Sequence, residues 1–349
     1  MKKIVIITGS CGLVGSEAVK FFIKKKYQVI GIDNNFRREL FGKDGDTTWI
    51  KKELIKKNEY IHFQIDIRDK KKINDVFKRY KKYIKIIIHS AAQPSHDWAK
   101  NNLLTDFSIN AEGTLNLLNA ALSFAPKSVF IQLSTNKVYG DNPNKIKLRE
   151  TKKRFIPVDK KKYKNGFDEQ LSTDHCTHSF FGVSKSYADY LAQEFGKNYK
   201  LKVGIFRAGC ITGPNHSGAK LHGFLSYLVK SCVNKKKYNI IGYKGKQVRD
   251  NIHSEDLLSC FWEFIKKPRY GEVYNIGGGT FSNCSIQECI SYISLKKKIK
   301  IKIKYTNKAR IGDHIWYISN VSKFKKDYPN WKQKFNTKKI LDELLGNYK

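Results

Sequence analysis

Short apolar runs alternate with amphipathic stretches through the first half of the chain. The first run ends in Ile4–Ile7 and shows no polar alternation. Further runs predict strands over Ile30–Asp33, Tyr60–Ile65, Ile84–His89, Val129–Leu133 and Val203–Phe206. Helical patterns fall between them at Ser16–Lys24, Asn74–Tyr83, Asp106–Phe124 and Ser184–Asn198. Continuously apolar strands are typical of parallel sheets covered on both faces, so the pattern predicts an α/β fold with a doubly wound parallel sheet.

A glycine-rich turn separates the first predicted strand from the first predicted helix. Gly9, Gly12 and Gly15 recur at three-residue spacing, and a strand–turn–helix of this kind brings backbone N–H groups to a dinucleotide pyrophosphate. Asp33 ends the second strand, where a carboxylate can accept the ribose hydroxyls and repel a 2′-phosphate. We therefore expect a Rossmann-type sheet that binds NAD rather than NADP.

The strand–helix rhythm ends near Pro214, after which the segments become shorter and more irregular. We therefore predict an NAD-binding domain over residues 1–210 and a mainly substrate-binding, smaller C-terminal lobe over 211–349, partly interleaved with the first. Stretches 36–58 and 141–175 lack an apolar period and are expected to be excursions from the domain, the first with a helix near Thr48–Lys57. Strand ends should meet at one edge of the sheet. These ends are Thr8, Asp33, Asp66, Ala91, Thr135 and Ala208.

Composition and charge limit the classes of partner that we expect for this chain. The chain has 349 residues and a net charge of +36, but its lysine runs are spread along the whole length without interleaved aromatic residues. This favours a solvated lysine-rich surface over a specific nucleic-acid partner. No apolar run approaches the roughly 20 residues of a membrane helix, and Lys2–Lys3 leads directly into a core strand, so we expect no membrane span and no signal peptide. Seven scattered cysteines without a C-x-x-C pair predict free thiols in the cytoplasm and no metal site.

Several segments occur in the order found in the extended short-chain dehydrogenase/reductase (NAD-dependent epimerase/dehydratase) family, which the chain resembles over essentially its whole length. They are Thr8–Gly15, Asp33, Asp66–Asp69, Ala91–Gln93, Ser134–Asp141 and Gly245–Asp250. Within that family the chain is most similar to the CDP-tyvelose (CDP-paratose) 2-epimerase group. The segments that carry this similarity are Ala91–Trp98, Ser134–Asp141, Asn165–Glu169 and Arg310–His314.

The resemblance implies an NAD-dependent epimerase that acts on a nucleotide-activated sugar, with a CDP-sugar favoured, through transient hydride transfer to NAD. It also implies a homodimer or homotetramer paired through the helices at 101–122 and 185–198. Another NAD-dependent nucleotide-sugar epimerase or oxidoreductase is one alternative. A non-catalytic protein that binds NAD and a nucleotide sugar is a second alternative, from a different class.

Site residues follow from the same resemblance. Residues expected at the cofactor are Gly9, Ser10, Cys11, Gly12, Leu13, Val14, Gly15, Asp33, Asn34, Asp66, Ile67, Ala91, Ala92, Gln93, Asn110 and Lys185. Residues expected at the substrate are Gln93, Ser95, Asn136, Lys137, Cys210, Arg249, Arg310 and His314. Asn136 and Lys137 stand where the family's 4,6-dehydratases carry an acid/base carboxylate pair, so dehydration is not expected. His96 and Trp98 are candidates for shaping the pocket.

One position departs from the family. Thr135 and Lys185 match its catalytic positions, but the tyrosine of Tyr-x-x-x-Lys is replaced by Phe181, whose phenyl ring cannot transfer a proton. A substituted base is one explanation, with His178 or Cys176 as candidates because both precede Phe181 closely. In a second explanation, Lys185 or a group of the substrate moves the proton. In a third, catalysis has been lost.

Overall fold

The computed structural model describes residues 3–215, 223–307, 309 and 312–347. At its centre lies a seven-stranded sheet of order β12-β8-β5-β4-β1-β2-β3, in which neighbouring strands pair in parallel. The strands are β1 (Ile4–Thr8), β2 (Gln28–Ile32), β3 (Tyr60–Phe63), β4 (Ile84–His89), β5 (Val129–Thr135), β8 (Lys202–Ala208) and β12 (Glu272–Ile276). This architecture confirms the predicted α/β fold with a doubly wound parallel sheet.

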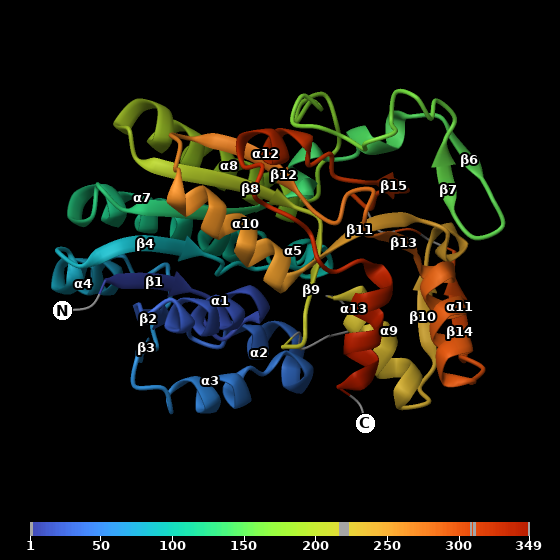
Figure 1. Cartoon of the computed structure of the whole chain (residues 1–349), viewed down its shortest axis with the longest axis horizontal. Coiled ribbons are helices and arrows are strands. Elements are labelled where there is room, and N and C mark those ends of the chain that lie inside the picture. The colour runs from blue at the N-terminus through green and yellow to red at the C-terminus, as the bar shows by residue number, and fades with distance from the viewer. Residues whose placement is uncertain (1–2, 216–222, 308, 310–311, 348–349) are drawn as a thin grey trace.

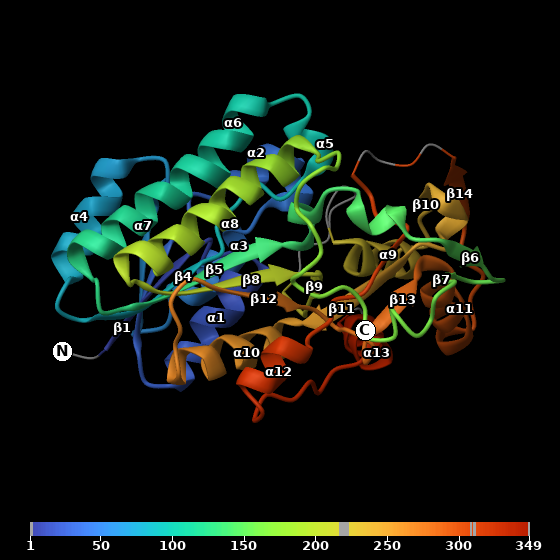
Figure 2. The ribbon, with the colours of Figure 1, turned by 90° about the horizontal axis from the view of Figure 1, so that it is seen from above.

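Helices cover both faces of this sheet (Figure 2). One layer consists of α4 (Lys70–Tyr80), α7 (Gly113–Phe124) and α8 (Phe180–Tyr199), and the other of α1 (Leu13–Lys24), α10 (Ser254–Lys266) and α12 (Ser322–Asp327). Successive side chains of β1 alternate between the layers: Val5 and Ile7 pack with α1, whereas Ile4 and Ile6 pack with α4 and α7. Since both layers exclude water, every residue of β1 is apolar or buried, which explains the run without polar alternation.

A smaller lobe lies beyond the carboxyl ends of the strands (Figure 1). Its elements are α9 (Phe224–Val233), β10 (Tyr238–Ile241), β11 (Val248–His253), β13 (Asn283–Ser285), α11 (Ile286–Lys297), β14 (Ile303–Thr306), β15 (Trp316–Tyr317) and α13 (Thr337–Gly346). Leu228, Ile240 and Ile293 belong to its own buried apolar cluster. β12 comes from the second half of the chain and still pairs with β8 of the large sheet. The domain boundary at residue 210 stays a prediction.

The two polar stretches contain regular structure. Residues 36–58 form α2 (Phe36–Phe41), a 3-10 turn (Gly42–Gly45) and α3 (Thr48–Leu54), and residues 141–175 include the antiparallel hairpin of β6 (Leu148–Glu150) and β7 (Phe155–Pro157). The helix predicted over 106–124 is instead two helices, α6 (Leu103–Phe107) and α7, joined by a π-helical turn at Ser108–Glu112.

Two further features are the lengths of the helices and the state of the cysteines. Within the described ranges, no helix combines the length and the hydrophobicity that a membrane span requires. All seven cysteines are free thiols. The thiol of Cys289 lies 3.2 Å from the sulfur of Cys284, with both side chains buried.

Candidate active site

A cavity of about 490 Å³ lies where the carboxyl ends of the strands face the smaller lobe. The glycine turn after β1 and the ends of β2, β5 and β8 line one side, and Tyr238 and Arg249 line it from the smaller lobe. The cavity therefore lies at the sheet edge where parallel α/β folds bind ligands.

The glycine turn can lie close to a ligand because it carries no side chains. Gly9 has a φ of +66°, a left-handed conformation that glycine adopts without strain. A Cβ atom on Gly15 would lie 1.9 Å from the carbonyl oxygen of Gly9, so no larger residue fits there. Gly12 immediately precedes α1, and the first N–H groups of a helix bind phosphate groups well. The turn thus fits a dinucleotide pyrophosphate.

The acidic residues at the next two strand ends fit the adenosine end of such a cofactor. Asp33 accepts hydrogen bonds from the N–H groups of Cys11 at 2.9 Å and Asn35 at 2.7 Å. Burial raises the pKa of Asp33, and these two hydrogen bonds oppose that shift. Asp66 accepts a hydrogen bond from the side-chain amide of Asn34 at 3.0 Å. Asp33, Asn34 and Asp66 all line the cavity, as do Leu13, Val14, Ile67, Ala91 and Ala92.

Four of the predicted cofactor residues do not line the cavity; they lie behind the residues that do. The Ser10 hydroxyl lies 2.8 Å from that of Tyr60. The Cys11 side chain lines a second hollow of about 300 Å³. Gln93 and Asn110 are buried, and the Gln93 N–H donates to Asn110 at 2.9 Å. These side chains support the loops that line the cavity and are not part of its lining.

Thr135, Phe181 and Lys185 line the other end of the same cavity. The Lys185 ammonium donates to the carbonyl oxygen of Leu133 at 2.9 Å. Burial lowers the pKa of Lys185 to about 8, against the attraction of Asp189 and Asp106. Phe181 is only 6% exposed. A hydrocarbon ring thus occupies the position of the family's tyrosine, beside a lysine that can lose its charge near neutral pH.

The structure does not bring His178 and Cys176 to the cavity lining. The His178 Nε2–H donates to the carbonyl oxygen of Val138 at 2.9 Å. The Cys176 sulfur lies 3.7 Å from Nδ1 of His178, and burial raises the pKa of the Cys176 thiol. Their assignment as the base stays a prediction without geometric support.

His96, which the sequence offers only as a candidate for shaping the pocket, lies at the cavity beside Phe181. Its imidazole lines the cavity and lies edge-on to Phe181, with ring centroids 4.9 Å apart. Nδ1 of His96 lies 2.7 Å from Oγ of Ser179. Because Ser179 is 83 positions away in the chain, only the fold brings these two residues together.

The predicted substrate residues divide into two groups. Those that line the cavity are Asn136, Lys137, Cys210 and Arg249. Ser95 instead caps the short helix α5 (His96–Ala99), where its hydroxyl accepts a hydrogen bond from the N–H of Trp98. His314 is buried, with Nε2 2.8 Å from the carbonyl oxygen of Gly140. Gln93 is buried behind the wall, and Arg310 lies outside the described residues.

Two cations and a carboxylate line the cavity where the large sheet faces the smaller lobe: Lys137, Arg249 and Asp313. Asp313 lies 2.5 Å from Nη2 of Arg249 and 3.9 Å from Nζ of Lys137. Nζ of Lys137 also donates to the carbonyl oxygen of Gly312 at 3.0 Å. Burial raises the pKa of Cys210 to about 12, so this residue presents a neutral thiol. Arginine and lysine beside one another suit the negative charge of a diphosphate.

Residues 5–277 match the NAD dependent epimerase/dehydratase family. The chain belongs to this family. Its cofactor is NAD, which the glycine turn, Asp33 and the cavity fit. Its relatives in the family are nucleotide-sugar epimerases and dehydratases, and the chain is an NAD-dependent enzyme of this kind.

Individual relatives and solved structures show how similar the chain is to particular members of the family. The chain is 31% identical to the CDP-paratose 2-epimerase of Salmonella typhi, with 97% of each chain covered. It is 27% identical to the dTDP-D-glucose 4,6-dehydratase of Dictyostelium discoideum, over 83% of this chain and 62% of that relative. The fold is shared with the UDP-glucuronic acid 4-epimerase of Bacillus cereus, solved with UDP-glucuronic acid and NAD. The TM-score is 0.77 at 21% identity, with 99% and 98% of the two chains covered.

Proposed function

We propose that this enzyme interconverts CDP-paratose and CDP-tyvelose by inverting C2 of the sugar. The observation that carries this proposal is the 31% identity to a CDP-paratose 2-epimerase over nearly the whole of both chains. NAD supplies the redox chemistry, because it can take a hydride from a sugar carbon and return it to the opposite face. The protein must then bind both molecules, exclude water and move the hydroxyl proton.

The cavity supports a distinct role for each part of the chain. The glycine turn and the N-terminus of α1 hold the pyrophosphate of NAD, and Asp33 accepts hydrogen bonds from its adenosine ribose. Lys185 binds the nicotinamide ribose, and Thr135 hydrogen-bonds the reacting hydroxyl of the sugar. These assignments are proposals that rest on one observation, namely that all of these parts of the chain line the same cavity.

The residues that line the cavity also indicate which reaction is favoured and where the diphosphate of the substrate binds. Asn136 and Lys137 line the cavity directly after Thr135, and neither supplies the carboxyl group that expulsion of water would need. Epimerisation without dehydration is therefore the better fit. We assign the diphosphate of the CDP-sugar to Arg249 and Lys137, which would exchange part of their contact with Asp313 for the substrate.

The test incubates the purified enzyme with NAD and CDP-paratose in deuterated water and follows the sugar by NMR. We expect CDP-tyvelose to accumulate to equilibrium, with the original hydrogen retained at C2 because the hydride does not exchange with solvent. UDP-glucuronic acid and dTDP-glucose serve as parallel substrates. No inversion at C2 and no transient NADH would refute the proposed substrate. Turnover of a parallel substrate instead would assign another nucleotide-sugar epimerase or oxidoreductase.

We also propose that the enzyme is a homodimer paired through α6 and α8. These helices present large apolar side chains to the surface, and Phe107 and Tyr187 pack together with ring centroids 5.7 Å apart. The apolar residues of this face are Leu103, Leu104, Phe107, Val183, Tyr187 and Tyr190, each between 42% and 87% exposed. Such a contiguous patch is typical of a protein interface. A tetramer would require a second interface in addition.

A further inference from the structure

The site described above has a cofactor end and a substrate end but no hydroxyl at the tyrosine position. Phe181 is buried against the cavity, four residues before Lys185 on α8. Oxidation of a sugar hydroxyl removes a hydride from carbon and a proton from oxygen. A catalytic protein therefore needs another group, close to Phe181, that can take up this proton.

We propose that His96 is this catalytic residue and that its Nε2 exchanges the proton with the reacting hydroxyl. The inference rests on the proposed epimerase function. The imidazole is in contact with Phe181, at 4.9 Å between ring centroids, and lines the same cavity as Thr135 and Lys185. Histidine changes its charge near neutral pH more readily than any other unperturbed side chain.

One contact of the imidazole bears on the roles of its two nitrogens. Nδ1 lies 2.7 Å from Oγ of Ser179, and that oxygen also accepts the N–H of Gly182 at 3.1 Å, where Ser179 caps α8. We place the proton on Nδ1, whose N–H then donates to Oγ of Ser179, so that Nε2 is the basic nitrogen. After Nε2 accepts the proton, the bond from Nδ1 persists and stabilises the imidazolium.

Buried hydrogen bonds hold the segment that carries His96. Ser95, directly before it, caps α5 and is itself held by Gln93, whose side-chain oxygen accepts the Ser95 N–H at 2.5 Å. The Gln93 amide in turn donates to Asp106 at 2.6 Å. All three supporting side chains are buried. A general base must be held in a fixed orientation to work, and this network restricts the backbone that carries the imidazole.

Other candidates in the described part of the chain fit less well. His178 and Cys176 do not line the cavity. The raised pKa of Cys210, about 12, keeps its thiol protonated. Lys185 donates to Leu133 and is the proposed partner of the nicotinamide ribose. Lys137 contacts Gly312 and Asp313 in the smaller lobe.

In the proposed step, the C2–H bond breaks and its electron pair passes as hydride to NAD⁺. The O–H bond breaks at the same time, its proton passes to Nε2 of His96, and the C=O double bond forms. The hydride would then return from the cofactor to the opposite face of C2, while His96 returns the proton to oxygen. The sugar is oxidised and then reduced, NAD is reduced and then oxidised, and no further reactant is needed.

The first test compares His96→Gln with His175→Gln. Glutamine is polar and of similar length but takes up no proton. His175 has a side chain that is 92% exposed and serves as the matched control. We expect kcat for CDP-paratose to fall by at least about 100-fold in His96→Gln, with the Kd for NAD unchanged. The control should match the wild type. A near-normal kcat, or an NAD affinity that falls as much as kcat, would overturn the assignment.

A second variant restores the family's tyrosine. Adding Phe181→Tyr to His96→Gln places a hydroxyl next to the mutated position, and we expect it to recover part of the lost turnover. Because the usual pKa of tyrosine is about 10 and that of histidine about 6.5, the rise of kcat/KM with pH should move to higher pH in the double variant. Recovery with an unchanged pH profile would contradict a change of base.

A third measurement needs no turnover and keeps the two proposals distinguishable. Diethyl pyrocarbonate acylates neutral imidazole nitrogens, and mass spectrometry locates the product. We expect His96 to be modified in the wild type and to be protected when NAD and CDP are bound, whereas protection of exposed His175 is not expected. If the wild type fails to invert CDP-paratose but His96 is protected, the proposed substrate is wrong and the placement of His96 stands. An unmodified or unprotected His96 refutes the assignment.

Discussion

Close packing in the glycine turn makes position 15 sensitive to a single methyl group. Since a Cβ on Gly15 would lie 1.9 Å from the Gly9 oxygen, alanine must push α1 away from β1. We expect Gly15→Ala to lower the free energy of unfolding by about 1–3 kcal/mol, the usual cost of overpacking. NAD affinity should fall too, because the N–H groups that meet the pyrophosphate move. Urea denaturation and equilibrium dialysis with NAD measure the two effects.

Gly346 provides the control for this experiment. It ends α13, and a Cβ atom there would meet nothing within 4 Å. Gly346→Ala should leave NAD binding unchanged and keep or slightly raise stability, since alanine favours helices. Equal losses of NAD affinity in the two variants would show that the glycine turn is not the pyrophosphate site.

Lys185 gives a pH-dependent prediction at the same scale. Its pKa is about 8 in the folded protein and 10.5 as its ordinary value. Between these values the unfolded chain binds a proton that the folded chain does not, so this residue makes stability rise from pH 8 to pH 10.5. The effect is on the order of 3 kcal/mol. Lys185→Met should lose this rise when stability without NAD is measured against pH.

Exposed Lys338, on α13, provides the matched substitution for that comparison. Lys338→Met should retain the wild-type slope, because other titrating groups contribute equally to both proteins. If Lys185→Met and the wild type show parallel curves above pH 8, burial does not depress the Lys185 pKa.

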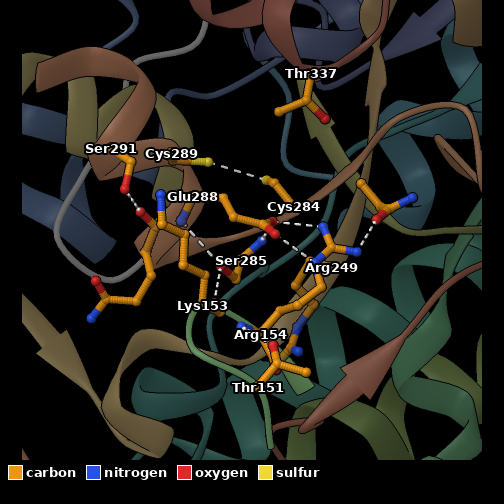
Figure 3. A network of polar contacts seen from close by, with 12 residues as sticks. Thr151, Lys153, Arg154, Arg249, Cys284, Ser285, Glu288, Cys289, Ser291 and Thr337 are labelled. Atoms are coloured by element: carbon orange, nitrogen blue, oxygen red, sulfur yellow. Dashed lines mark hydrogen bonds and ion pairs between the residues drawn. The ribbon is translucent and has the colours of Figure 1, made fainter. Parts of the chain in front are cut away.

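At the scale of elements, the start of α11 shows how the hairpin of β6 and β7 is fixed to the smaller lobe (Figure 3). The guanidinium of Arg154, just before β7, donates two hydrogen bonds of 2.6 Å to the carboxylate of Glu288. Glu288 also accepts the N–H of Ser285 and completes a capping box at the helix start. The Ser285 hydroxyl donates to the Lys153 carbonyl oxygen at 2.6 Å.

This arrangement predicts a measurable loss in Arg154→Met. The bidentate geometry favours a strong pair, but side chains that are 28% and 30% exposed are screened by water, so we expect a loss of about 1 kcal/mol in urea denaturation. Lys244→Met is the control, because its Nζ lies 4.0 Å from Glu150 on a side chain that is 75% exposed. A loss in Arg154→Met no larger than in the control would show that the pair does not stabilise the hairpin.

Element types followed from the sequence where local patterns determine them. Ile84–His89 matches β4 from end to end, and its four isoleucines supply the apolar character that predicts a buried strand. Helix starts were less accurate: α8 begins at Phe180 rather than Ser184, since Ser179 caps it. The π-helical turn after α6 and the hairpin of β6 and β7 depend on contacts with distant segments. No periodic pattern of apolar residues in the sequence predicts them.

The site residues differ in the same way: local sequence predicts some of them, and others depend on contacts between distant segments. The glycine turn and Asp33 are local signals, since backbone conformation and strand position determine what they can bind. The role proposed for His96 depends on Ser179 and Phe181, more than 80 positions away, which α8 brings beside α5. Proximity in sequence pointed instead to His178, whose Nε2 is engaged with the backbone of Val138.

At the scale of the whole molecule, the proposed dimer makes the last prediction. Leu104 on α6 is 87% exposed and lies in the apolar face shared with α8. Leu295 on α11 is 80% exposed but lies in the smaller lobe, so it offers a matched control. A glutamate at an apolar interface leaves a charge that must be desolvated without a partner. We expect Leu104→Glu to shift the protein to monomers in sedimentation equilibrium, whereas Leu295→Glu should sediment as the wild type. A wild type that is monomeric at every concentration, or equal dissociation in both variants, would refute pairing through α6 and α8.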